Sequence, residues 1–285
     1  MLMTAKCACA TCNRVLPIRD MIRMDKNDRG GAASYLCDEH AYSTESYTYE
    51  HDRTWGKGKA HGFTYGVELE SMTDSIKSRV ELLNRDWVAS YDSTVEVEFK
   101  SPIMLGLNAL SKDCAQIELM NNRNELDTID DDCGTHLNIG NIYHINAETI
   151  DYLRRFMHSL FIPLSDYLEA NPDEAKKVFG RQFTYYAGGI NRNTDPMTHE
   201  LFINFQHNNR VEFRLCKFIT AKQYMNCAKM CTEMMTALIN NFILHFNDEP
   251  KDSRRYATKT AYRKHKAEVT AAKLVKIFQK YEAKM

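Results

Sequence analysis

Polar residues two positions apart recur in four segments that otherwise consist of strand-forming residues. The four pairs are Glu68 and Glu70, Glu96 and Glu98, His136 and Asn138, and Glu212 and Arg214. Side chains alternate between the two faces of a β-strand, so both members of each pair point to the same face. Their neighbours are mostly apolar, which predicts that the other face of each strand packs in a core.

Carboxylates dominate these pairs, accompanied by one imidazole and one guanidinium. A strand face that is only solvated more often carries Lys, Thr, Ser and Gln. If the four faces line one concave surface, their carboxylates and His136 could bind Mg²⁺ or Mn²⁺, and Arg214 could hold a phosphate through two hydrogen bonds. Such metal ions bridge phosphate oxygens and neutralise the charge that develops during phosphoryl transfer. The pattern therefore favours nucleotide-phosphate chemistry, although the sequence lacks the phosphate loop GxxxxGK.

The rest of the sequence alternates strand-like and helix-like segments. Strand patterns cover 63–70, a hairpin over 87–102 that turns at Asp92 and Ser93, 133–140, 200–206 and 211–216. Helical patterns cover 74–86, the stretch after Pro102 that includes Met104 and Leu105, 146–169 with Asn146 as its cap, 221–246 and 251–285. Antiparallel strands separated by helices predict an α+β protein whose sheet carries helices on one face.

Metal-ligand spacing marks the N-terminus as a separate module. The ligands form the pairs Cys9-x2-Cys12 and Cys37-x2-His40, which are separated by 24 residues. This spacing is typical of two knuckles that close one tetrahedral zinc site, and Cys7 is an alternative to Cys9. All four positions would be protein ligands, so the zinc would be structural. We expect a zinc-ribbon or treble-clef-like module over residues 1–43.

Three further segments follow this module. A polar linker over 44–60 precedes the candidate catalytic domain over 61–247, and a basic helix occupies 248–285. From residue 251 onward the sequence has eleven Lys and Arg against three Asp and Glu. We expect this helix to pack through apolar residues, while a polyanion-binding helix is the alternative. The apolar residues are Val269, Leu274, Ile277 and Phe278.

Overall composition restricts the environment of the protein. With 285 residues and a net charge of −1, the chain has no bulk attraction to nucleic acid or to anionic membranes. Nine cysteines, an odd number scattered along the sequence, fit free thiols in a reducing compartment better than a disulfide framework. No apolar run approaches the length of a membrane span. We therefore expect a cytoplasmic protein.

Five short motifs of the sequence resemble the amidoligase family of bacterial and bacteriophage genomes, which belongs to the superfamily of glutamine synthetase and glutamate-cysteine ligase. In order, the motifs are YGVELE (65–70), DST (92–94), EFKSP (98–102), CGTHLNIG (133–140) and VEFRLCKFIT (211–220). The resemblance covers residues 61 to about 245. It implies a glutamine-synthetase-like antiparallel sheet and an ATP-dependent carboxylate-amine ligase, in which ATP phosphorylates a carboxylate and an amine then displaces the phosphate. A bacterial or phage-infected cell is the implied setting.

The resemblance also implies roles for individual residues. Glu68 and Glu70 correspond to the paired glutamates that hold two divalent metal ions around the ATP phosphates. Glu98 is similar to a further acidic ligand, and His136 to a histidine that contacts metal or phosphate. Glu212 and Arg214 match a Glu-x-Arg pair that holds metal and stabilises the transferring phosphoryl group, and Asn204 occupies a position that is often polar. Two positions depart from the family pattern, since Asn138 replaces a second histidine and Ile219 a frequent glycine.

Two other functions compete with the ligase. In one, Cys133 is a nucleophile activated by a histidine, but Cys133 and His136 lie three residues apart on a strand and face opposite ways. In the other, the protein is not an enzyme, and its zinc module and basic helix bind nucleic acid or a protein partner. Acidic residues on the sheet would repel phosphates unless metal intervened, which weighs against nucleic acid at that face. In the ligase, the zinc module would present a macromolecular acceptor, or the substrates would be small molecules or peptides.

Overall fold

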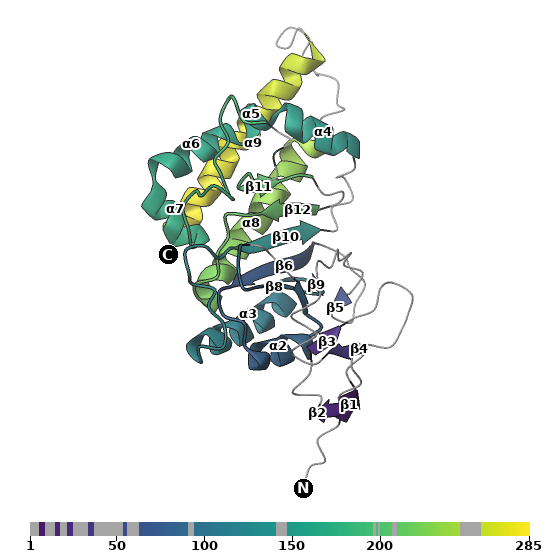
Figure 1. The fold of residues 1–285 in the computed structure, drawn as a ribbon. Helices are drawn as coiled ribbons and strands as arrows, with labels where there is room; N and C mark the ends of the chain where they lie inside the picture. Colours follow the sequence, from purple (N-terminus) through teal and green to yellow (C-terminus); the bar gives the residue numbers. More distant parts are fainter. Residues whose placement is uncertain are drawn as a thin grey trace.

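The α+β architecture expected from the sequence is confirmed by the computed structural model (Figure 1). The structure describes residues 63–90, 94–140, 147–195, 198, 200–206, 210–245 and 258–285, with five short strands before residue 56. Within these residues, one large sheet is combined with eight α-helices. The glutamates and the arginine of the candidate site all lie in this described part.

The large sheet has a long central pair of strands. Its order is β7, β8, β6, β10, β12 and β11, with β9 also beside β6 and β5 beside β9. The strands are β5 (Thr54–Trp55), β6 (Thr64–Ser71), β7 (Val88–Ser90), β8 (Val97–Lys100), β9 (Ile103–Leu105), β10 (Thr135–Gly140), β11 (Ile203–Asn204) and β12 (Arg210–Phe213). Neighbouring strands run antiparallel, except that β5 is parallel to β9. Because β6 and β10 are flanked on both sides, their polar side chains meet residues from three or more strands.

The described residues form eight α-helices beside the sheet. They are α2 (Ile76–Leu83), α3 (Leu107–Asn122), α4 (Ala147–Arg155), α5 (Met157–Leu160), α6 (Ile162–Ala170), α7 (Pro172–Phe179), α8 (Ala221–Asn241) and α9 (Lys259–Glu282). The Tyr65 hydroxyl lies 3.0 Å from the Thr232 hydroxyl, which joins β6 to α8. The indole of Trp87 donates a hydrogen bond of 2.7 Å to Asp113 of α3. These contacts fix α3 and α8 on the face opposite the polar residue pairs.

The long helix expected over 146–169, with one interruption at Pro163, is divided twice, into the three shorter helices α4, α5 and α6. The interruptions fall at Phe156 and Phe161. The second interruption agrees with the expected one, since Pro163 lies in the first turn of α6, where its missing N–H has no intrahelical partner to lose. Asn146, the expected cap, lies outside the described residues.

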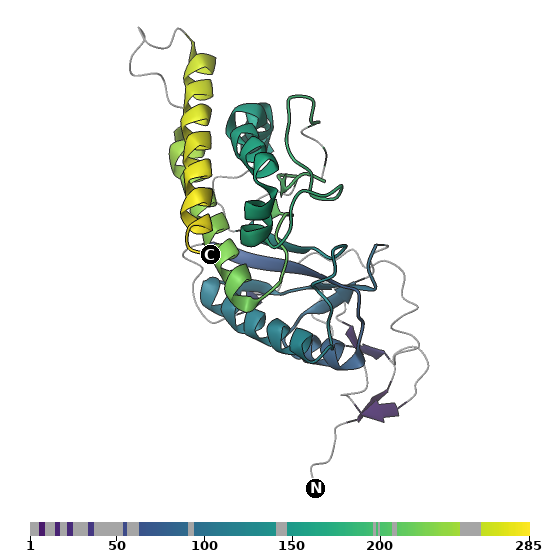
Figure 2. The ribbon, with the colours of Figure 1, turned by 90° about the vertical axis from the view of Figure 1, so that its left-hand side faces the viewer.

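The C-terminal helix α9 packs against α5, α6, α7 and α8 and stands beside α8 in Figure 2. Its buried residues follow helical spacing and are Ala267, Thr270, Ala271, Leu274, Ile277 and Phe278. Three of the four expected packing residues are therefore confirmed. Val269 is the exception, since it is 49% exposed and lies outside this stripe. Some cations of α9 bind within the chain: Lys280 lies 2.7 Å from Glu233 of α8.

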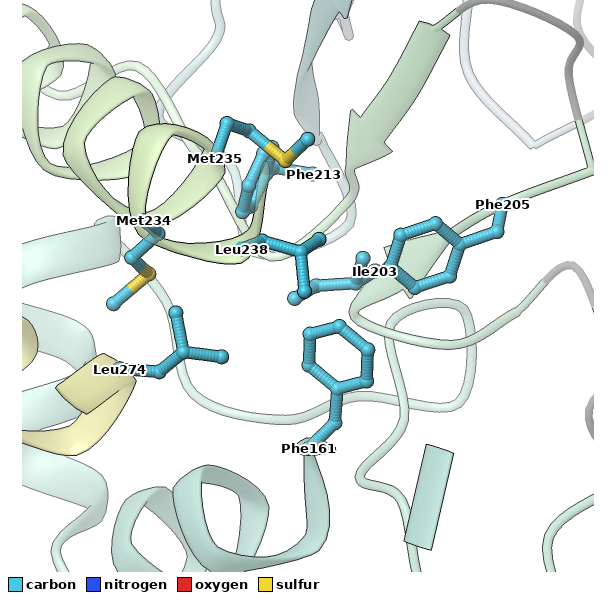
Figure 3. Close-up of a pocket in the computed structure, with 8 residues that line it drawn as sticks. All are labelled: Phe161, Ile203, Phe205, Phe213, Met234, Met235, Leu238 and Leu274. Atoms are coloured by element: carbon cyan, nitrogen blue, oxygen red, sulfur yellow. The ribbon is translucent and has the colours of Figure 1, made fainter. Parts of the chain in front are cut away.

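An apolar pocket marks the place where the sheet, α8, α9 and the α5–α6 connection meet (Figure 3). It is lined by Phe161, Ile203, Phe205, Phe213, Met234, Met235, Leu238 and Leu274. None of these side chains could orient a ligand through a charge or a strong hydrogen bond. We therefore assign this pocket to the packing between the layers.

Residues 103–105 were expected to be helical, which is wrong. They form β9, whose Ile103 and Met104 pair with β5 and whose Met104 and Leu105 pair with β6, and the helix α3 begins only at Leu107. Gly106, with φ of +91°, separates the two elements in a conformation that favours glycine. The apolar run thus supplies a strand first and a helix second.

Four short strands precede the large sheet. They form two antiparallel pairs, β1 (Lys6–Ala8) with β2 (Val15–Pro17), and β3 (Ile22–Met24) with β4 (Ser34–Leu36). The expected zinc ligands Cys9, Cys12, Cys37 and His40 lie outside the described residues, so the zinc module stays a prediction. Strand β5 lies within the segment expected to be a linker.

Among the described helices, none combines the length and the apolar character needed to cross a membrane.

Candidate active site

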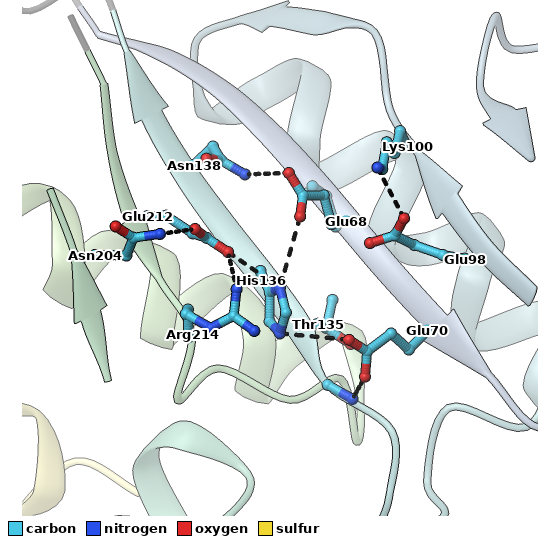
Figure 4. A network of polar contacts seen from close by, with 12 residues as sticks. Glu68, Glu70, Glu98, Lys100, Thr135, His136, Asn138, Asn204, Glu212 and Arg214 are labelled. Carbon is cyan, nitrogen blue, oxygen red and sulfur yellow. Dashed lines mark hydrogen bonds and ion pairs between the residues drawn. The ribbon is translucent and has the colours of Figure 1, made fainter. Parts of the chain in front are cut away.

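Strand register brings the polar pairs together on one face of the sheet (Figure 4). Glu68 of β6 stands opposite His136 of β10. Glu212 of β12 stands opposite Asn138 of β10 on one side and Asn204 of β11 on the other. Residues far apart in the sequence therefore converge, because each strand presents its even-numbered residues to this face.

Glu68, His136 and Glu212 form the centre of this polar face. His136 Nδ1 lies 3.1 Å from Glu212 Oε1 and 3.6 Å from Glu68 Oε2. One potential ligand atom from each of the three residues lies within 4.8 Å of the other two. Such a set of two carboxylates and one imidazole matches the ligands that divalent cations accept in proteins.

Two buried polar atoms at this centre lack a hydrogen bond that meets the usual geometric limits. Neither His136 Nδ1 nor the Oδ1 atom of Asn138 has a hydrogen-bond partner of acceptable geometry. The amide nitrogen of Asn138 is engaged, since it donates to Glu68 Oε1 at 3.2 Å. His136 Nδ1 still faces the Glu212 carboxylate at 3.1 Å, so the Oδ1 atom of Asn138 is the oxygen that remains available to a cation beside the carboxylates.

The electrostatics of this centre depend on the protonation of His136. Burial alone would lower the pKa of His136, but the carboxylates of Glu212 and Glu68 beside it raise that pKa to about 9. Burial would likewise raise the pKa of Glu68, but the contact with His136 lowers it below its usual value. Without a metal ion, an imidazolium therefore offsets part of the negative charge of Glu68 and Glu212, and a metal ion that binds Nδ1 must displace its proton.

Glu212 is held by residues on both sides. Its Oε1 accepts a hydrogen bond of 2.9 Å from Arg214 Nη1, and its Oε2 accepts one of 2.8 Å from Asn204 Nδ2. Arg214 follows the end of β12, and its Nε donates to the backbone carbonyl of Tyr186 at 3.1 Å. The side chain of Arg214 remains 16% exposed, so its guanidinium lies at the edge of the site rather than in the core.

Glu70 contacts the opposite side of His136. Glu70 Oε1 lies 3.5 Å from His136 Nε2, and Glu70 Oε2 accepts a short hydrogen bond from the backbone N–H of Gly134. A Cβ at Gly134 would lie only 2.8 Å from His136 Nε2 and 2.9 Å from Arg181 Nη2. A side chain at position 134 would therefore force His136 or Arg181 to move.

Arg181 is a site residue that the sequence did not indicate. Its side chain is largely buried, its Nη2 donates to the backbone carbonyl of Arg214, and burial lowers its pKa while the charge of Glu70 favours its protonated form. It comes from the connection after α7, outside any strand pattern. The only local signal is its place after Gly180, which ends α7 in the left-handed conformation.

Glu98 lies across from Glu70 in the register of β8 and β6. It is not part of the central triad, because its Oε2 contacts Ser90 Oγ at 2.7 Å and Lys100 Nζ at 2.9 Å. Burial raises the pKa of Glu98. Glu96, which precedes β8, is exposed and contributes nothing to this cluster.

A cysteine nucleophile is disfavoured by the surroundings of Cys133. Its side chain is fully buried, and burial together with nearby carboxylates raises its pKa to about 12. A nucleophilic cysteine needs the opposite environment, one that favours the thiolate.

Stability should depend on pH through His136. The folded-state pKa of about 9 lies above the ordinary value of 6.5, so the imidazolium stabilises the metal-free protein below pH 6.5, and this contribution disappears as the pH rises through 9. The difference between these two pKa values corresponds to about 3 kcal/mol of folding stability. Urea unfolding with a chelator present, at several pH values between 6 and 10, measures this loss. His136→Gln is the comparison, and an equal pH dependence in both proteins would contradict the assignment.

Comparisons with known proteins identify no relative of this chain. No protein-family model matches the chain, and searches of curated proteins and of solved structures find no significant match.

Proposed function

We propose that this protein is an ATP-dependent carboxylate-amine ligase with a glutamine-synthetase-like sheet. The observation that carries the proposal is the convergence of Glu68, His136 and Glu212 on one sheet face, with Arg214 beside them. Glu70 lies against His136, and Glu98 is the cross-strand neighbour of Glu70. An acidic face of this kind suits a triphosphate only when metal ions separate the like charges.

Two groups of residues would hold the divalent ions. Glu68, His136 and Glu212 would hold one Mg²⁺ or Mn²⁺ ion, and Glu70 and Glu98 would contribute to a second. The unpaired Oδ1 atom of Asn138, beside Glu68 and Glu212, supports this fit. When bound, the ions would neutralise phosphate charge and orient the triphosphate for an in-line transfer.

Phosphoryl transfer would make the first chemical step. A substrate carboxylate oxygen attacks the γ-phosphorus of ATP, the bond to the β-phosphate oxygen breaks, and ADP leaves. Arg214 would donate hydrogen bonds to the transferring group and stabilise its negative charge. Asn204 would keep the Glu212 carboxylate in place, because it binds Oε2. Arg181 would hold the Arg214 backbone through the carbonyl of that residue.

Amide formation would make the second step. A neutral amine attacks the acyl carbon of the acyl phosphate, inorganic phosphate leaves, and the nitrogen loses a proton. The carboxylates of the face are candidates to accept that proton. The substrates would be small molecules or peptides, or a macromolecular acceptor presented by the zinc module. Zinc in that module would be structural.

Nucleotide binding tests the proposal without knowledge of the acceptor. Calorimetric titration of ATP into the full chain should show binding with Mg²⁺ and none with a chelator, because the bare carboxylates repel the triphosphate. ADP release should follow once the correct carboxylate and amine are supplied. Failure of ATP to bind even with Mg²⁺ or Mn²⁺ would refute the proposed function.

A further inference from the structure

A second cluster of potential metal ligands lies in the core, on the side of the sheet that α8 covers. Cys216 follows β12, and Cys227 and Cys231 occupy consecutive turns of α8. Their sulfur atoms lie within 4.8 Å of one another, and the Sγ atoms of Cys216 and Cys227 are 3.4 Å apart. All three side chains are fully buried. A helical spacing of four residues aims two thiols at the same point, and the strand end supplies the third.

Ordinary packing does not explain this grouping well. A buried cysteine usually behaves as a small apolar residue, as Cys114 does on α3, where burial raises its pKa strongly. In the cluster, by contrast, three thiols converge on one point, and the Sγ atoms of Cys216 and Cys227 lie within hydrogen-bonding distance of each other. The guanidinium of Arg181 lies near enough to act electrostatically on Cys216. The cluster therefore offers three convergent thiols as ligands to a single ion.

We propose that Cys216, Cys227 and Cys231 bind a thiophilic divalent ion such as Zn²⁺, separate from both the acidic face and the N-terminal module. Thiolates are the ligands that select such soft ions over Mg²⁺. Three thiolates carry three negative charges, which a divalent ion and the nearby guanidinium of Arg181 together neutralise. Binding releases the thiol protons to solvent, and neither oxidant nor reductant is needed.

The ion would connect the candidate active site to α8. Cys216 lies two residues after Arg214, and its backbone carbonyl accepts a hydrogen bond of 3.0 Å from Thr135, the neighbour of His136. A metal bound to Cys216 and to α8 would therefore fix the segment that carries Arg214. This inference does not depend on the proposed ligase activity.

Cadmium titration of the reduced, metal-stripped full chain tests the proposal. Cd²⁺ bound by thiolates gives ultraviolet charge-transfer absorption, which Cd²⁺ bound by the carboxylates of the acidic face does not. The double variant Cys12→Ser with Cys37→Ser removes the predicted N-terminal site. We expect this variant to keep one thiolate-bound Cd²⁺ per chain and to unfold at a higher temperature when Cd²⁺ is present.

Variants of the cluster give the matched comparison. In the double-variant background, Cys227→Ser should lose the remaining thiolate-bound ion, whereas Cys114→Ser, a buried thiol outside the cluster, should retain it. Circular dichroism shows whether each protein is folded. If the folded double variant binds no Cd²⁺ through thiolates, the proposal is wrong, whatever the further variants do. Retention of the ion by folded Cys227→Ser would overturn it as well, and ATP binding is not involved in either result.

Discussion

Replacing Glu68 by Gln is expected to abolish ATP turnover and to weaken Mn²⁺ binding by at least about 100-fold. The substitution removes one negative charge from the central triad, while a glutamine oxygen can still accept the hydrogen bond from Asn138. Glu68 is 16% exposed and Glu212 is 2% exposed, so the substitution at Glu68 disturbs the core less, although it also removes one ion pair of His136. Calorimetry with Mn²⁺, followed by ATP in the presence of Mn²⁺, measures both effects.

Glu169→Gln is the matched control for this experiment. Glu169 is an exposed glutamate on α6, and the same change there should leave metal and nucleotide binding as in the unaltered protein. Equal Mn²⁺ affinities for Glu68→Gln and the unaltered protein would show that Glu68 is not a metal ligand.

Arg214→Lys should lower the rate of phosphoryl transfer by about 10³-fold while changing ATP affinity much less. Lysine keeps the charge but loses the planar fork that binds both Glu212 and the carbonyl of Tyr186. The lost interactions matter most when charge develops on the transferring group. Single-turnover measurement of ADP release, beside calorimetric ATP binding, separates the rate from the affinity.

Arg123→Lys supplies the control for the arginine. Arg123 is exposed at the C-terminal end of α3, and the same exchange there should affect neither rate nor affinity. If Arg214→Lys lowered ATP affinity as much as the rate, the guanidinium would bind the ground state and would not specifically stabilise transfer.

Alternation along the strands made most of the candidate site predictable. Side chains at positions two apart share a face whatever the register, so Glu68 with Glu70 and Glu212 with Arg214 could be paired from the sequence. The antiparallel neighbours then place these pairs side by side, as the register of β6, β10 and β12 shows. The α+β class followed from the same alternation, interrupted by helical spacing.

Residues in the connections between strands and helices could not be predicted from strand alternation. Arg181 reaches the site from the segment after α7, and only the path of the chain in space brings it to Gly134. Glu96 shared the spacing of Glu98 but lies before β8, and strand ends are poorly fixed by local sequence. The cysteine cluster was also missed, because its third thiol comes from another element.

The contacts of α9 have a consequence for how the molecule is assembled during synthesis. Phe278 packs against Phe179 and Tyr167, with ring centroids 5.8 and 5.7 Å away, and Leu274 closes the apolar pocket beside Met234. These partners leave the ribosome before α9 does. Before α9 is synthesised, the nascent chain exposes an apolar surface on α7 and α8. This partly synthesised chain is therefore the species that is most prone to bind chaperones or to aggregate.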